Sequence, residues 1–303
     1  MMMKQNITRS KLRDALDRAD GVSDSAAEAT IVELRKFLKR YVKAFKAAML
    51  DFSSNEKALI DLAEQQQMIA LAQDILEEAG YGDVVDRFRE ELGKVEKESI
   101  RYFKEFMDKT PTYSGVAREA IELMSDAFVE NLDLTIDQRL VKPLENYVRQ
   151  TTLALNDRKQ AVQEIARYID TSGIVRKDGE QFTAVNIETL VAETPRRFAE
   201  VIRATQATEL GLQVFVYTGP LDKVTSEQCE FLLTEKPHGA AGMWYREEIK
   251  VGMHPELKEN PLTARGHYGC RHQWGPVDEA GAKRIDPAFV PRSKEKSEQR
   301  EAA

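Results

Sequence analysis

The chain of 303 residues is poor in cysteine, histidine and long apolar runs, and each shortage excludes a class of protein. With only 2 cysteines it does not resemble a disulfide-stapled secreted scaffold, and reduced thiols in a cytoplasm are expected. No run of 18 or more apolar residues occurs, so we expect no membrane span. The beginning, MMMKQNITRSKLRD, has no apolar core and no cleavage site, so no signal peptide is expected.

The chain also lacks an excess of positive charge. Its net charge is −7 and its pI is about 5.4. An acidic chain gains no affinity from the release of counterions from phosphates, so we do not expect it to bind nucleic acid over a large part of its surface. One helical stretch nevertheless carries a basic face, made of Arg35, Lys36, Lys39, Arg40, Lys43 and Lys46. A solvated face opposite an apolar stripe is the favoured interpretation, and docking to an acidic partner or to DNA phosphates is the alternative.

Proline is absent before Pro111, whereas seven of the ten prolines lie from Pro220 onward. The first part can therefore form long helices, and the last part must be rich in turns. We expect a mainly α protein, with a body of long antiparallel helices over residues 1–170 and a linker and connecting helix over 171–210. A small α+β module over 211–290 and a disordered charged tail over 291–303 should follow.

Apolar residues at steps of three and four support the helical body. The first stripe consists of Ile31, Leu34, Leu38, Tyr41, Phe45, Ala48 and Phe52. Capping boxes predict helix starts at Ser25 and Ser53, and a further start is predicted at Thr135. The turn AGYGD at 79–83 should end a helix, Pro143 should kink or restart one, and Thr194-Pro195 should begin another. A short β-type run follows at Val214–Tyr217.

All cysteines and histidines of the chain lie in one stretch near its end. They are Cys229, His238, His254, His267, Cys270 and His272. A turn-rich module of this size buries little apolar surface and is stabilised by a cross-link such as a bound metal ion. Buried cysteines and solvated histidines without a metal are the alternative interpretation of the same residues.

Zinc prefers four tetrahedral ligands, commonly thiolate sulfur and imidazole nitrogen. Cys270 and His272 are two residues apart, so on an extended segment they would point to the same side and share one ion. Cys229 would supply the second thiolate. His238, in the turn Pro237-His238-Gly239, is the expected fourth ligand, and His267 is the alternative. We therefore predict a structural zinc site.

Several of these residues belong to a longer pattern. The segments are Tyr217-Thr218-Gly219-Pro220-Leu221-Asp222, then Thr225 and Cys229, then Tyr268-Gly269-Cys270-Arg271-His272-Gln273-Trp274. This pattern resembles the C-terminal signature of tailed-phage minor head proteins, the Mu F-like head-morphogenesis family. The specific match covers residues 215 to 277. Ser226 and Gly269 depart from it, since the family often has arginine and asparagine there.

The resemblance implies a structural virion protein and not an enzyme. Such a protein would sit in the capsid interior or at the portal vertex, after assembly in the host cytoplasm, and act in head assembly or in DNA packaging or delivery. Its expected partners are the portal protein and the major capsid or scaffold protein, with incidental contact to packaged DNA and none to membrane. The resemblance also favours metal binding, because its Cys and His positions are kept.

Two other functions remain open at this point. Asn260, His267 and His272 could belong to a small HNH-like metal-dependent nuclease, although two thiolates favour a closed structural site. The helical stripes alone would also suit a helical adaptor protein.

Overall fold

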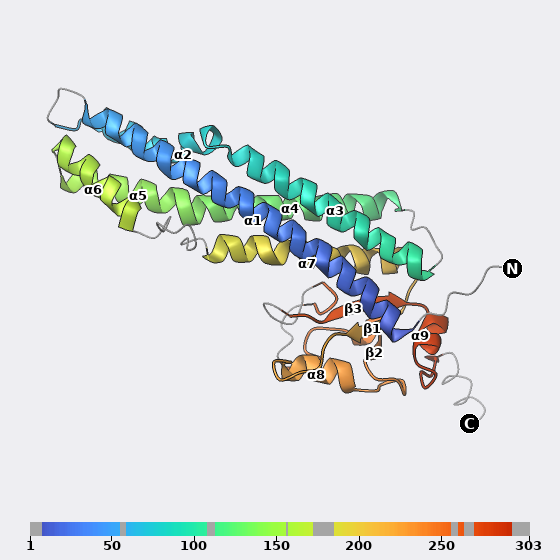
Figure 1. Cartoon of the computed structure of the whole chain (residues 1–303). Helices are drawn as coiled ribbons and strands as arrows, with labels where there is room; N and C mark the ends of the chain where they lie inside the picture. The colour runs from blue at the N-terminus through green and yellow to red at the C-terminus, as the bar shows by residue number, and fades with distance from the viewer. Residues whose placement is uncertain are drawn as a thin grey trace. The chain divides into compact units, whose positions relative to one another are not determined.

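The computed structural model describes residues 8–54, 59–107, 113–155, 157–171, 185–255, 260–263 and 270–292. Within these ranges the protein is mainly helical, with a small antiparallel sheet near its end, as the sequence predicted (Figure 1). None of the described helices is both long and apolar enough to cross a membrane.

The helices and strands follow one another in a simple order. The long helices are α1 (Arg9–Ser53), α2 (Leu62–Glu78), α3 (Tyr81–Met107), α4 (Gly115–Ile136), the π-helix η1 (Asp137–Val141), α5 (Lys142–Ala154), α6 (Arg158–Thr171) and α7 (Val185–Glu209). The last part contains β1 (Val214–Thr218), α8 (Glu227–Thr234), β2 (Met243–Tyr245), the 3-10 helix η2 (Arg246–Glu248), β3 (Gln273–Val277) and α9 (Glu279–Ile285).

The chain forms two compact units, and both are discontinuous in sequence. Unit 1 combines residues 1–25, 92–124 and 195–303, and unit 2 combines residues 26–91 and 125–194. This division differs from the sequence-based one, which separated a helical body from a C-terminal module. The reason is that α1, α3, α4 and α7 each contribute to both units.

Unit 2 is a helical bundle whose core includes the middle of the predicted stripe, whereas Ile31, Ala48 and Phe52 at its ends are only partly buried. Phe37, Tyr41 and Phe45 of α1 are fully buried, and the Tyr41 hydroxyl donates to the carbonyl of Ala72 on α2 at 2.6 Å. At one end, α2 pairs with α5 through a hydrogen bond of 2.8 Å from Gln65 to Thr152. Burying such a large aromatic stripe is the main source of stability for this unit.

The observed helix ends correct several predicted ones. Ser25 lies inside α1, which begins at Arg9, because alanines and charged residues continue the helical pattern ahead of it. The capping box of α2 uses Asp61 and not Ser53, and Asp61 accepts from the backbone N–H of Glu64 at 2.9 Å. The glycine turn is confirmed, since Gly80 has φ of 82° between α2 and α3.

Proline shapes two of the helices. No helix begins at Thr135: α4 continues into the π-helix η1, and Pro143 follows directly in the first turn of α5. The wider π turn accommodates a residue that has no N–H and whose ring crowds the preceding turn. Pro195 was predicted at a helix start, but it lies inside α7, which begins at Val185. Most of the segment predicted as a linker or hairpin, 172–184, lies outside the described residues.

The sheet of unit 1 has the order β2-β1-β3 with antiparallel pairing throughout. β1 is the central strand and is completely buried, which explains its unbroken β-branched and aromatic sequence. Helical residues from elsewhere in the chain share its core, namely Leu12 and Leu16 of α1 and Tyr102 and Phe103 of α3. The Tyr102 hydroxyl donates to the carbonyl of Pro276 on β3 at 3.0 Å.

Candidate metal centre

Three of the predicted ligands meet beside the central strand of the unit 1 sheet. Cys229 lies in the first turn of α8, where Ser226 caps the helix and accepts from the backbone N–H of Cys229. Cys270 and His272 lie in the short segment that leads into β3, and because they are two residues apart an extended backbone turns both to the same side. All three side chains are buried. The three residues therefore form a group that could hold a metal ion, as the clustering in the sequence suggested.

The donor atoms are close together. Cys229 Sγ lies 3.7 Å from Cys270 Sγ, and Cys270 Sγ lies 3.6 Å from His272 Nδ1. All donor atoms of the group lie within 4.8 Å of one another. The sulfur separation is far longer than the ~2.05 Å of a disulfide, and both cysteines are free. The three donor atoms thus form a small buried triangle.

The backbone fixes the imidazole. His272 Nε2 lies 2.8 Å from the carbonyl oxygen of Pro220, and a carbonyl can only accept. Nε2 therefore carries a proton, and Nδ1 is the nitrogen that faces the sulfurs and would ligate a metal ion, with Nε2 held by a second partner as in metal-ligating histidines. Gly219 makes this approach possible, because a Cβ there would overlap the His272 ring. The position of the His272 ring therefore depends on both Gly219 and Pro220.

A hydrogen bond between the two thiols makes Cys270 more acidic and Cys229 less acidic. This contact lowers the pKa of Cys270, with help from His272, and raises the pKa of Cys229, which burial raises further. The Tyr217 hydroxyl lies 3.3 Å from Cys229 Sγ, and its ring stacks on His272 with centroids 5.6 Å apart. A thiolate in this position is the form that ligates metals.

The residues fit a tetrahedral metal ion. Zinc at ~2.3 Å from sulfur and ~2.0–2.1 Å from nitrogen holds two sulfurs about 3.8 Å apart and a sulfur and a nitrogen about 3.6 Å apart. The observed separations of 3.7 Å and 3.6 Å agree with these two edges. The Cys₂His group is therefore able to hold a metal ion with almost no rearrangement of the measured edges.

The other histidines have different positions. His238, the expected fourth ligand, is not brought to this group: its Nε2 lies 3.0 Å from Glu248, and its ring meets Tyr245 edge-on. The turn that was expected to aim His238 at the metal instead buries it beside this carboxylate. The His254 ring lies 5.4 Å from that of Phe231. His267, the alternative fourth ligand, lies outside the described residues.

Other residues of the C-terminal pattern surround the group. Arg271, on the opposite side of the strand from the ligands, forms an ion pair of 2.6 Å with Asp222. This hydrogen bond lowers the pKa of the Asp222 carboxyl. Trp274 packs on Tyr217 with ring centroids 4.6 Å apart. Sequence reasoning missed Pro220 as a positioning group, because a backbone carbonyl leaves no trace in residue type.

The basic face of α1 is largely neutralised within unit 2. Arg35 pairs with Glu188 at 2.8 Å, and Lys36 and Arg40 both approach Glu33. Lys46 pairs with Asp170. Four of the six cations of this face thus have acidic partners, which supports the interpretation as a solvated face.

The comparisons with known proteins add no relative. No family model matches the chain, and no curated protein or solved structure is similar to it.

Proposed function

We propose that the chain is a structural minor head protein of a tailed phage, and that a zinc ion held by Cys229, Cys270 and His272 stabilises its C-terminal part. Its role would lie in head assembly or in DNA packaging or delivery, with the portal protein and the major capsid or scaffold protein as partners. The proposal joins the sequence resemblance to the geometry of one site.

The observation that carries the proposal is the convergence of the resembling segments. They are separated in sequence, yet Pro220 fixes His272, Asp222 pairs with Arg271, and Tyr217 contacts Cys229. The contacts of Asp222 with Arg271 and of Tyr217 with Cys229 join side chains of the resembling segments, and His272 can approach Pro220 because Gly219 has no side chain. A chance match of scattered residues gives no reason for such pairing, so the convergence supports the resemblance.

Burial favours a structural ion over a nuclease site. Cys229, Cys270 and His272 are at most 4% exposed, and both nitrogens of His272 already face a partner. A metal nuclease needs an open coordination position and a base beside the scissile phosphate. Nothing of this kind is found around the Cys₂His group in the described part of the chain. When bound, zinc would supply cross-linking of α8 to β3 and no chemistry on a substrate.

Metal content tests the site. The purified, untagged protein should contain about one zinc per chain by elemental mass spectrometry, since one closed tetrahedral site holds one ion. Cys229→Ser and Cys270→Ser should each abolish it. His254→Ala, which removes a histidine of the same region but outside the group, is the matched control and should keep the metal. Metal-free wild-type protein would overturn the zinc site.

The virion role needs a separate test. Phage particles induced from cells that encode the chain should contain its peptides in few copies, detected by quantitative mass spectrometry of banded particles. Particles without the protein would refute the minor head assignment even if zinc is present. A plasmid-cleavage assay with magnesium or zinc tests the nuclease alternative. That alternative requires the wild-type protein to cleave plasmid DNA and His267→Ala to abolish the cleavage.

A further inference from the structure

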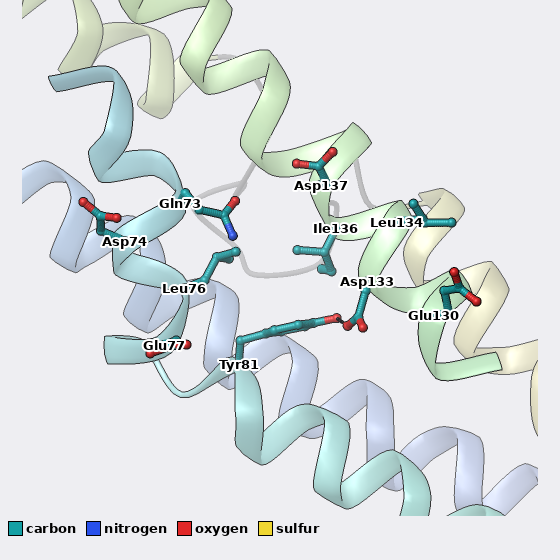
Figure 2. A pocket seen from close by; sticks show the side chains of 10 residues that line it. All are labelled: Gln73, Asp74, Leu76, Glu77, Tyr81, Glu130, Asp133, Leu134, Ile136 and Asp137. Atoms are coloured by element: carbon teal, nitrogen blue, oxygen red, sulfur yellow. Dashed lines mark hydrogen bonds between the residues drawn. The ribbon is translucent and has the colours of Figure 1, made fainter. Parts of the chain in front are cut away.

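Unit 2 contains a pocket of about 710 Å³ (Figure 2). Its walls come from the last turns of α2, the first residue of α3, the last turns of α4 and the start of η1. Pockets of a few hundred to about 1,000 Å³ suit ligands the size of a few side chains and not whole protein surfaces. The pocket is independent of the metal centre, which lies in unit 1.

The floor of the pocket is apolar. Leu76 and Ile136 are 7% and 1% exposed, and their side chains point toward each other across the hollow (Figure 2). The Tyr81 ring closes one side, and its hydroxyl donates to Asp133 at 2.6 Å. Tyr81 is also held from behind by Phe37, with ring centroids 5.4 Å apart. The floor is therefore preformed and able to take an apolar side chain.

The rim of the pocket is acidic. It carries the carboxylates of Asp74, Glu77, Glu130, Asp133 and Asp137, and no lysine or arginine is among the described lining residues. Lys142 lies 3.8 Å from Asp137 and is 57% exposed, so solvent screens this ion pair. Like charges around a hollow with apolar walls focus a negative potential into it.

We infer that this pocket docks a short basic segment of a partner protein. One apolar side chain of the segment would enter between Leu76 and Ile136, and flanking lysine or arginine side chains would meet the carboxylates of the rim. The charge complementarity selects a basic occupant, and the apolar floor selects a peptide over a bare cation. The inference goes beyond the proposed virion role and does not depend on the zinc site.

The test uses the full-length protein and a fluorescein-labelled peptide of alternating lysine and leucine, with binding followed by fluorescence anisotropy at low salt. Glu77→Gln/Glu130→Gln removes two rim charges. Glu119→Gln/Glu122→Gln is the matched control, because it removes the same two charges from exposed positions of α4 outside the pocket. Thermal melts followed by circular dichroism would check that both variants remain folded.

We expect the rim variant to weaken peptide binding about fivefold to tenfold, as two screened charge pairs allow, and the control to change it less than about twofold. Equal weakening in both variants would mean that the peptide responds only to net charge, and would overturn the inference. Spermidine at matched charge should compete poorly, because it has no apolar anchor. Competition as strong as that of unlabelled peptide would reduce the pocket to a cation site and would also overturn it.

Discussion

Gly219 has no side chain, and the imidazole of His272 fills the space that a Cβ would take. Gly219→Ala should therefore displace the ring and break its hydrogen bond to Pro220. Loss of such a supporting contact costs about 10-fold to 100-fold in metal affinity. Titration against a chromophoric zinc chelator measures the change. Gly93→Ala, at a helical position where a Cβ meets nothing within 4 Å, should leave the affinity unchanged.

The fourth ligand can be decided by comparing two histidines. His267→Ala should lose zinc, because two thiolates and His272 leave one tetrahedral position to fill. His238→Ala should keep zinc, since its imidazole lies against Glu248 and Tyr245. Metal analysis of the two variants in parallel gives the answer. Zinc retained in the His267 variant and lost in the His238 variant would reverse our assignment.

Among the elements, the start of α2 depends on an ion pair that responds to pH. Arg158, which is 3% exposed, contacts Glu64 at 2.6 Å, and this hydrogen bond is the main reason that the Glu64 pKa lies below its ordinary value. A lowered folded-state pKa stabilises the fold above the pKa of the unfolded chain, and this contribution is lost as the pH falls.

Glu64→Gln should therefore lower the melting temperature at neutral pH, and the gap to wild type should narrow as the pH falls below about 4, because the stabilisation is lost between the unfolded pKa and the lower folded pKa. Thermal melts of both proteins across this range test the prediction. Glu77→Gln, at an exposed position of the same helix, should show no such trend. A gap that is constant with pH would show that Glu64 acts through packing and not through its charge.

The elements also show what the sequence could and could not predict. The apolar stripes, the Gly80 turn and the strand at 214–218 follow from local periodicity and turn chemistry, so they were predictable. The helix starts at Ser25, Thr135 and Thr194 were wrong, because a cap residue marks a start only where the preceding residues cannot continue the helix. The meeting of Cys229, Cys270 and His272 could be expected from their clustering in the sequence, whereas the position of His238 depends on a contact with Glu248 that no local pattern encodes.

At the scale of the whole molecule, the sheet of unit 1 requires the first helix. Leu12 and Leu16 are fully buried in the sheet core, and a Cβ at Gly275 would lie 2.9 Å from Leu12 Cδ1. Leu16→Ala should cost about 2–5 kcal/mol and speed the loss of zinc to a chelator, although residue 16 is far from the ligands in sequence. Leu38→Ala, which truncates the core of unit 2, is the control and should leave the rate of zinc loss unchanged.

The shared core has a consequence for biosynthesis. A ribosome releases Leu12 and Leu16 well before β3, the strand that completes their core. Domains tend to fold as units during synthesis, so unit 2 can close first, while the N-terminal part of α1 stays exposed as an apolar segment. Cys229 likewise lacks its partner thiol until Cys270 has been synthesised. We expect the nascent chain to need chaperone protection of α1, and zinc capture to follow the emergence of Cys270 and His272.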